Sequence, residues 1–135
     1  MKPFILYLVT PERKLYEQEV SSVTLPVKEG QITVLSNHTP YIGALQAGEI
    51  TVRNNDEKEE YIAISGGFVE FNKNRLVVLV ETAEKSTEIN EDRVKEAIKK
   101  AQEMKKQKNI QETDYAVLAS KLEKEFARLR VVRRR

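Results

Sequence analysis

The sequence predicts an α+β organisation: an antiparallel β-sandwich of about eight to ten strands over residues 1–88, then an antiparallel two-helix hairpin over residues 89–135. Between Phe4 and Glu81, short β-branched and aromatic runs alternate with a period of two and are separated by turn residues, as in all-β sandwiches. After Glu88 the apolar period becomes 3.6 residues, which indicates helices. A length of 135 residues leaves room for one compact domain with a short appendage.

The predicted strands are runs of four to eight residues bounded by Gly, Asn, Ser and Pro. They cover residues 4–9, 20–27, 31–35, 41–45, 49–53, 60–64, 68–71 and 76–80. Residues 36–40 are predicted to form a loop, because four of the five favour turns and Pro40 biases Thr39 toward an extended backbone.

The first predicted helix begins after Asn90, a good N-cap, with acidic residues in its first turn where the helix dipole favours them. Its apolar stripe is Val94, Ala97, Ile98, Ala101 and Met104. Residues 109–112 form a short connection, and Thr113 is predicted to cap the second helix. The second stripe is Tyr115, Leu118, Ala119, Leu122, Phe126 and Leu129. The short connection favours a hairpin in which the stripes cover each other, and the shallow, alanine-rich first stripe predicts a pair that detaches or opens.

Composition excludes several classes of function. The chain has no cysteine and one histidine, so a disulfide framework, a thiolate nucleophile and a histidine-based metal site are not expected. No apolar run is long enough to span a bilayer, and the first residues lack the layout of a signal peptide, so we expect the protein to remain in the compartment where it is made.

Charge is distributed unevenly along the chain. Residues 1–88 hold 9 Lys/Arg against 13 Asp/Glu, whereas residues 89–135 hold 14 against 8, so the net charge changes from −4 to +6. A basic tail on an acidic body predicts an anionic partner, which charge alone leaves open among nucleic acid, a membrane surface and an acidic protein segment.

Several motifs, in order, resemble the epsilon subunit of bacterial F-type ATP synthases, and the likeness covers nearly the whole chain. They are residues 9–12 (VTPE), 15–17 (LYE), 30–40 (GQITVLSNHTP), 64–70 (ISGGFVE) and 84–93. The resemblance implies a non-catalytic rotor subunit at the cytoplasmic face of the bacterial membrane, attached through the complex. The implied partners are the gamma subunit, the ring of c subunits and the catalytic beta subunit.

The resemblance also implies roles for individual residues. The hairpin is expected either to fold against the sandwich or to extend and inhibit ATP hydrolysis, with its basic second helix meeting an acidic segment of the beta subunit. The residues implied in that contact are Lys121, Lys124, Arg128 and Arg130. A loop facing the c ring is implied for Gln31, Asn37 and His38.

No cofactor is required, but some relatives bind ATP as a regulatory ligand at the start of the first helix. The corresponding residues here are Glu84, Ile89, Asn90, Arg93, Lys100, Lys124 and Arg128. Asn90 and Val94 replace the family's Asp and Ala, and lysine at two of the three basic positions cannot grip phosphate as arginine does. We therefore predict weak ATP binding at most.

Plainer interpretations compete with these roles. His38 lacks a partner for acid-base chemistry, which favours a locally hydrogen-bonded loop residue. Gly66 and Gly67 precede a strand rather than a helix, so tight backbone geometry explains them better than a phosphate loop. A basic-tailed nucleic-acid-binding module is the alternative function, but the acidic sandwich argues against it. A free-standing enzyme would need a convergent catalytic set, which we do not find in the sequence.

Overall fold

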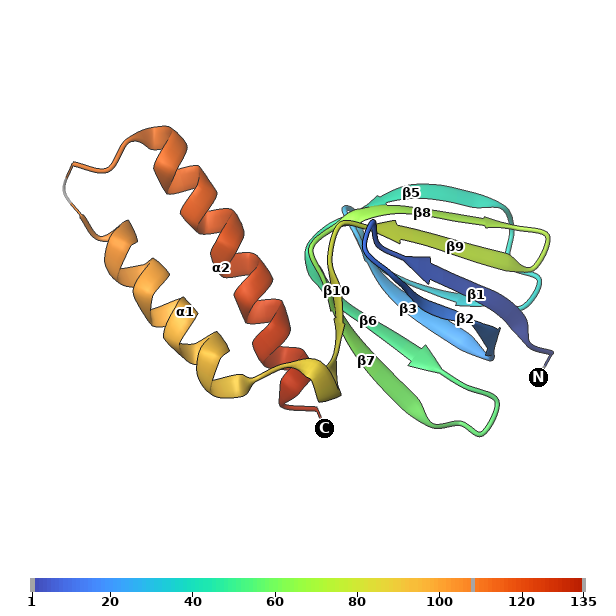
Figure 1. Cartoon of the computed structure of the whole chain (residues 1–135). Helices are drawn as coiled ribbons and strands as arrows, with labels where there is room; N and C mark the ends of the chain where they lie inside the picture. The colour runs from blue at the N-terminus through green and yellow to red at the C-terminus, as the bar shows by residue number, and fades with distance from the viewer. Residues whose placement is uncertain (1, 108, 135) are drawn as a thin grey trace.

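A computed structural model describes residues 2–107 and 109–134 as a β-sandwich joined to a protruding helical hairpin (Figure 1). The strands are β1 (Phe4–Val9), β2 (Lys14–Val20), β3 (Ser22–Val27), β4 (Gly30–Leu35), β5 (Tyr41–Leu45), β6 (Gly48–Arg53), β7 (Glu59–Ile64), β8 (Gly67–Asn72), β9 (Arg75–Val80) and β10 (Ala83–Lys85). The 3₁₀ turn η1 (Ser86–Glu88) leads to α1 (Glu91–Lys105) and α2 (Glu112–Val132).

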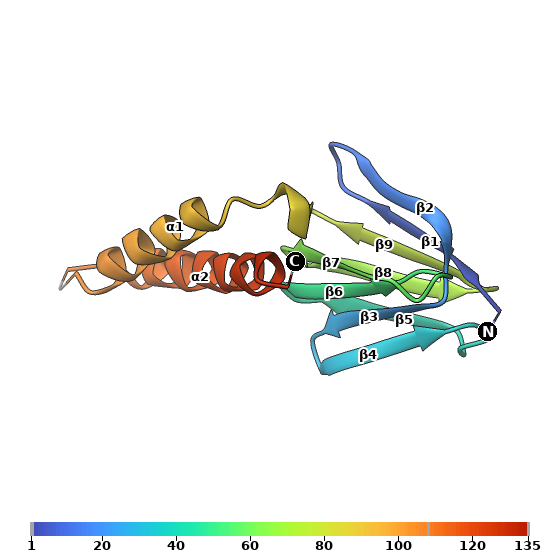
Figure 2. The ribbon, with the colours of Figure 1, turned by 90° about the horizontal axis from the view of Figure 1, so that it is seen from below.

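The strands form one continuous ladder that folds over itself into two layers (Figure 2). Their order is β10-β7-β6-β3-β5-β8-β9-β1-β2, with β4 also paired to β3. All of these pairs are antiparallel except β1 with β9, which run parallel. Pairing of the first strand with the ninth brings the beginning and the end of the sandwich sequence together, so the body closes before the hairpin begins.

The core lies between the layers and follows the period of two that the sequence showed. Along β1 every second side chain, from Phe4 through Leu6 to Leu8, is buried, and β3 alternates in the same way. The rings of Phe4 and Phe71 meet edge to face, with their centroids 5.6 Å apart. In these strands, alternation therefore buries one face and leaves the other for solvent or a partner.

The ten strands in the described part of the chain agree with the predicted number, but the sequence did not predict two of them. Strand β2 buries only Tyr16 and Val20, so it lacks regular apolar alternation, and β10 has three residues. The predicted strand over residues 20–27 is wrong at its start, because Val20 ends β2 and β3 begins at Ser22. A polar edge strand is specified by pairing to its neighbour rather than by its own pattern.

The two helices form the predicted antiparallel hairpin, with one error in capping (Figure 1). The side chain of Asn90 accepts a hydrogen bond from the backbone N–H of Arg93, which confirms the α1 N-cap. The cap of α2 is Gln111, without a side-chain hydrogen bond, so the prediction for Thr113 is wrong and Thr113 lies inside the helix. Neither helix is long and apolar enough to cross a membrane, within the part of the chain that the structure describes.

A small cluster of buried residues joins the hairpin to the sandwich. In this hairpin cluster, Leu118 and Leu122 of α2 pack with Val94, Ile98 and Ala101 of α1. Its remaining members are Ile89, Val131 and Val132, together with Ala63 from β7. The C-terminal end of α2 contacts β6 and β7, while the end of α1 and the start of α2 lie away from the sandwich (Figure 2).

Three large residues of the predicted helical stripes do not take part in this packing. Tyr115 and Phe126 of α2 are 46% and 38% exposed, and Met104 of α1 is 42% exposed. The buried residues at the end of α2 instead include Ala127, Val131 and Val132, which lie on the side that meets the sandwich. Docking on the body, rather than helix pairing alone, therefore decides which face of α2 is buried.

Candidate functional site

The outer face of β5, β8 and β9 carries large apolar side chains that nothing in the described part of the chain covers. Ile42, Phe68 and Leu79 are 76%, 66% and 50% exposed. Cross-strand pairing places Phe68 between Ala44 and Leu79, and the same row continues through Leu79 to Val9 on β1. We call the group Ile42, Phe68, Val77 and Leu79 the outer apolar patch.

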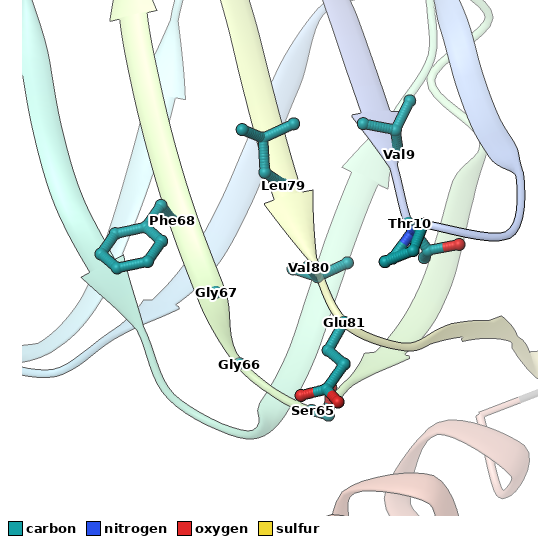
Figure 3. A pocket seen from close by; sticks show the side chains of 10 residues that line it. Val9, Thr10, Ser65, Gly66, Gly67, Phe68, Leu79, Val80 and Glu81 are labelled. Carbon is teal, nitrogen blue, oxygen red and sulfur yellow. The ribbon is translucent and has the colours of Figure 1, made fainter.

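Beside this patch, an open groove of about 640 Å³ runs to the end of the sandwich nearest the hairpin (Figure 3). It is lined by Val9, Thr10, Pro11, residues 65–68 and residues 79–81. Most of this lining is apolar or backbone, and its carboxylate comes from Glu81. The groove can therefore hold an apolar segment of another molecule more readily than it can perform acid-base chemistry.

Gly67 gives the groove its shape. Its φ of +156° is unfavourable for other residues, and a Cβ at this position would lie 2.0 Å from the carbonyl oxygen of Leu79. Gly66 also has a positive φ, and its carbonyl accepts from the backbone N–H of Glu81. These contacts confirm that the glycine pair serves tight backbone geometry.

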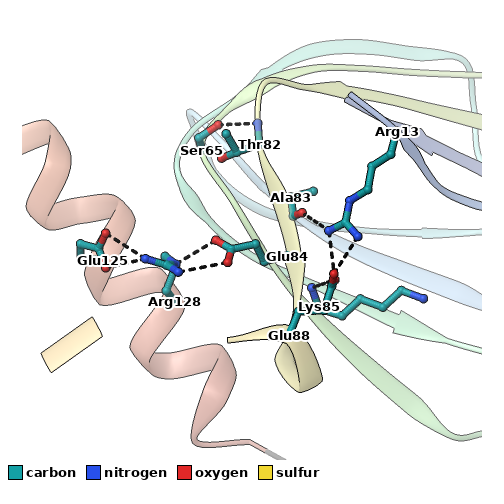
Figure 4. Close-up of polar contacts among 9 residues, drawn as sticks. All are labelled: Arg13, Ser65, Thr82, Ala83, Glu84, Lys85, Glu88, Glu125 and Arg128. Carbon is teal, nitrogen blue, oxygen red and sulfur yellow. Dashed lines mark hydrogen bonds and ion pairs between the residues drawn. The ribbon is translucent and has the colours of Figure 1, made fainter. Parts of the chain in front are cut away.

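A second site lies between the sandwich edge and α2, where one arginine meets two carboxylates (Figure 4). Nη2 of Arg128 donates to Oε2 of Glu84 at 3.0 Å, and its Nη1 donates to both carboxylate oxygens of Glu125 at 3.0 Å. Nε of Arg128 also lies 2.8 Å from Oε1 of Glu84, but without hydrogen-bond geometry, so we treat that contact as electrostatic. We call these three residues the Arg128 cluster.

The Arg128 cluster is partly shielded from water. The side chains of Arg128, Glu84 and Glu125 are 28%, 33% and 11% exposed. Burial disfavours the charged guanidinium, yet the hydrogen bond with Glu84 and the two negative charges outweigh it and raise the pKa of Arg128. Because shielding weakens screening by salt, this ion pair counts for more than an exposed one.

The linker before the hairpin is fixed to the sandwich by a second arginine (Figure 4). Arg13 donates to both carboxylate oxygens of Glu88, at 2.7 and 3.0 Å, and to the carbonyl of Ala83 at 2.9 Å. The backbone N–H of Lys85 also donates to Glu88. The hydrogen bond from Arg13, followed by that from Lys85, lowers the pKa of Glu88 despite partial burial.

Two arginines that directly follow α2 add a further polar attachment. Nε of Arg134 lies 2.5 Å from a carboxylate oxygen of Glu49 on β6, and its guanidinium stacks 5.1 Å from the centre of the Tyr61 ring. Arg133 pairs with Glu91 at the start of α1. The basic end of the chain is thus partly neutralised by acidic residues of the body and of α1.

The structure brings together only some of the residues predicted to bind ATP. Glu84 and Arg128 are in contact, but each is already paired. Ile89 is buried in the hairpin cluster, and Asn90 is used in capping α1 through the N–H of Arg93. Lys100 and Lys124 are exposed on the helices. ATP binding therefore stays a prediction, and a ligand there would have to displace Glu84 from Arg128.

The residues predicted to face the beta subunit separate into two kinds. Lys121, Lys124 and Arg130 are exposed on α2, whereas Arg128 is held in the cluster. In this docked arrangement three of the four cations are accessible to a partner.

The residues predicted to face the c ring lie at opposite ends of β4. Gln31 is next to the β3–β4 turn, while Asn37 follows the other end and bonds with Asn74. His38 lies in a loop, with its Nδ1 2.6 Å from the carbonyl of Thr39 and its ring against Phe71, which confirms its local structural role. A strand of this length spans roughly 20 Å, so one partner would have to reach across it.

Sequence reasoning missed the outer apolar patch and the carboxylates of Glu49 and Glu125. The alternation in β8 contained the signal for Phe68, because Val69 and Phe71 occupy the opposite face and are buried. Nothing local marks Glu49 or Glu125 as partners of arginines, since their contacts depend on how α2 docks.

The comparisons with known proteins agree with this architecture. The family described as ATP synthase, Delta/Epsilon chain, beta-sandwich domain matches residues 3–86. The chain is 39% identical over 97 residues to the ATP synthase epsilon chain of Moorella thermoacetica, covering 72% of each protein. It is 36% identical over 127 residues to that of Syntrophomonas wolfei, covering 94% of this chain and 92% of the relative.

Solved structures show the same fold at greater distance. A chain in the Euglena gracilis mitochondrial ATP synthase has a TM-score of 0.81 at 23% identity, covering 90% of this chain and 76% of that chain. A chain in the central stalk and c-ring structure of the Tetrahymena thermophila mitochondrial ATP synthase has a TM-score of 0.62 at 16% identity, covering 96% and 93%.

Proposed function

Because this chain belongs to the ATP synthase epsilon chain family, we propose that it is a non-catalytic subunit of the central rotor. In this proposal its sandwich binds the gamma subunit and rests on the c ring, and its hairpin restrains ATP hydrolysis by changing position. The protein would lie at the cytoplasmic face of the bacterial membrane, held there by the complex.

The observation that carries the proposal is the outer apolar patch. Phe68 at 66% exposure and Ile42 at 76% leave apolar area in water that a partner protein would cover, and such contiguous area marks interaction sites. The adjoining groove extends this surface to Val9 and Pro11. We assign this face to the gamma subunit, because binding there leaves the hairpin's site on β6 and β7 unobstructed.

The remaining partner assignments follow the positions of the predicted residues. Exposed Lys121, Lys124 and Arg130 offer α2 to an acidic segment of the beta subunit, and salt should weaken that contact. The polar residues at the two ends of β4, Gln31 on one side and Asn37 with His38 on the other, are our candidates for the c ring.

The patch assignment is tested by replacing Phe68 with aspartate. We expect Phe68→Asp to weaken capture of the gamma subunit by at least tenfold, since it buries a charge in an apolar contact. Val117→Asp is the matched control, because Val117 is also 66% exposed but lies on α2. Equal capture by both variants and the parent chain would place the gamma contact elsewhere.

The hairpin assignment is tested by ending the chain after Glu88. In a reconstituted ATP synthase we expect the truncated subunit to assemble and the rate of ATP hydrolysis to rise, because the inhibitory α2 is gone. Assembly without any change in hydrolysis would refute an inhibitory hairpin while leaving the family assignment intact.

ATP as a regulatory ligand is a subordinate proposal. The support is the proximity of Glu84 and Arg128 and the exposure of Lys100 and Lys124. Calorimetry with the isolated chain should detect weak binding in the millimolar range, and its absence would remove the proposal. Filter binding of nucleic acid at low salt tests the alternative function, for which steep salt dependence is the expected signature.

A further inference from the structure

We propose that the Arg128 cluster is a ligand-independent latch that holds the hairpin against the sandwich. The inference deepens the proposed function, since it concerns the same hairpin, but the latch is a property of the isolated chain. It assigns Glu84 as the anchor on β10, Arg128 as the part that moves with α2, and Glu125 as the residue that positions Arg128.

The geometry joins two parts of the chain that are 44 residues apart. Glu84 belongs to β10, which is paired with β7 and so moves with the sandwich. Arg128 presents Nε and Nη2 to Glu84 and presents Nη1 to Glu125 within its own helix. Both sides of the guanidinium are therefore occupied by carboxylates. While the hairpin is docked, Arg128 is not free to bind another anion.

Glu125 explains why Arg128 is aimed at the sandwich rather than at solvent. Its side chain is 11% exposed, and a shielded carboxylate without a cation is unfavourable. The bond from Nη1 to Glu125 satisfies that carboxylate and fixes the rotamer of Arg128. Part of the entropy cost of ordering the long Arg128 side chain is therefore offset by a contact within α2, in addition to the contact with Glu84.

The apolar contact around the latch is small, which gives the ion pair a large share of the docking energy. The hairpin cluster meets the sandwich through Ala63, Val131 and Val132, with the ring of Tyr61 only partly buried against it, and these side chains offer less area than the sandwich core. Arg134 with Glu49 supplies a second polar attachment, but the Arg134 side chain is 50% exposed and more strongly screened. We therefore assign the main polar restraint to Arg128.

The experiment measures how often the hairpin leaves the sandwich. Because the chain has no cysteine, Ala63→Cys introduces a single thiol at a position that is 4% exposed and covered by the hairpin. The rate at which a thiol reagent modifies it reports hairpin opening, even when the docked form predominates. In this background we expect Glu84→Gln and Arg128→Gln each to accelerate labelling about tenfold.

A double variant tests whether the two residues act as a pair. If they form one latch, Glu84→Gln with Arg128→Gln should accelerate labelling far less than the product of the single effects. Arg128→Lys should give an intermediate rate, since lysine keeps the charge but loses the two-sided grip. Lys121→Gln, an exposed cation on the same helix, is the matched control and should leave the rate unchanged.

A thiol in the sandwich core separates latch opening from general destabilisation. Val78 is fully buried in the body core, so labelling of Val78→Cys reports unfolding of the sandwich. The latch variants should leave this rate unchanged. Unaltered labelling at position 63, equal acceleration at positions 63 and 78, or fully multiplicative effects in the double variant would each overturn the latch.

Failure of the latch and failure of the proposed function are distinguishable. One outcome is that Glu84→Gln and Arg128→Gln accelerate labelling of the isolated chain, while truncation after Glu88 leaves the rate of ATP hydrolysis in the reconstituted complex unchanged. This outcome would support the latch and count against the inhibitory hairpin. Loss of inhibition on truncation after Glu88, with no effect of Glu84→Gln or Arg128→Gln on labelling, would support the inhibitory hairpin and overturn the latch.

Discussion

The sandwich and the hairpin hold themselves together in different ways. The sandwich core packs large side chains from both layers, with Leu6, Leu76 and Phe71 at 1% exposure or less. The hairpin cluster is built largely from valine, alanine and a few larger residues, and it includes Ala63 of the sandwich. The sandwich has its own buried core and strand ladder, whereas the hairpin needs its neighbour and the polar contacts of Arg128 and Arg134.

This contrast indicates that the hairpin can dock on the sandwich or leave it while both regions stay folded. A helix pair with a thin apolar seam can leave its docking site without disturbing the body, because the sandwich ladder closes through β1 and β9. We therefore expect equivalent substitutions in the two regions to have unequal consequences.

The strongest contrast should come from the same substitution made once in each region. Leu76→Ala, at a fully buried site, should lower the free energy of unfolding of the sandwich by about 4 kcal/mol through lost burial and a cavity. Leu122→Ala in the hairpin cluster should leave the sandwich transition nearly unchanged. Chemical denaturation followed by a probe in each region measures both effects.

A loss of sandwich stability in Leu122→Ala equal to that in Leu76→Ala would contradict the distinction between the regions. It would mean that the two regions unfold as one cooperative unit, and the predicted division at Glu88 would then have no thermodynamic meaning.

Gly67→Ala should be the next most damaging change. A Cβ there would meet the carbonyl oxygen of Leu79 at 2.0 Å, so the strand pair must move, and we expect a loss of about 3 kcal/mol. Gly30→Ala is the control, since its φ of +136° is also positive but no atom of residues 2–107 or 109–134 lies within 4 Å of the added Cβ. Thermal unfolding should show the smaller loss for Gly30→Ala, and equal losses would contradict the steric explanation.

Capping of α1 offers a milder test that is confined to the hairpin. Asn90→Ala removes the acceptor of the Arg93 N–H and should destabilise the helix by about 1 kcal/mol. Asn90→Asp keeps the cap and should restore helicity, which hydrogen exchange of the α1 amides can measure. Faster exchange in the sandwich core as well would show that the cap matters beyond the hairpin.

The weakest expected effect is a dependence of linker order on pH. The pKa of Glu88 is lowered from its ordinary value of 4.5, so its contact with Arg13 is stabilising above that pH and is lost as the pH falls through the folded-state pKa. Because the Glu88 side chain is 35% exposed, we expect less than about 1 kcal/mol. Carboxyl titration by NMR should show the pKa of Glu88 returning upward in Arg13→Gln, while the pKa of Glu59, which is lowered by its hydrogen bond from Arg53 instead, stays where it is.

Much of the fold could be predicted from the sequence, because the local period of apolar residues indicates the secondary structure. The alternating runs that became β1, β3 and β9, and the Asn90 cap that begins α1, each carry their own signal. Strand β2 was missed because Glu17, Gln18 and Glu19 interrupt its apolar pattern, and its pairing with β1 alone makes it a strand.

In the candidate sites, too, some residues could be grouped from the sequence, whereas other contacts depend on the tertiary structure. The exposed cations Lys121 and Lys124 could be grouped from the sequence, because a spacing of three residues on a helix places them near one another. The contact of Arg128 with Glu84 depends on where α2 docks, and the resemblance that grouped these residues did not indicate that they pair with each other.

Neighbouring residues alone specified the two kinds of secondary structure, the change between them near Glu88 and the basic character of the tail. Tertiary packing was needed to establish that Phe68, Ile42 and Leu79 form one uncovered surface, and that Arg128 and Arg134 are already paired with acids of the body. The physical reason is that solvent exposure and ion pairing are properties of surfaces brought together by folding, and no local pattern of residues encodes which surfaces meet.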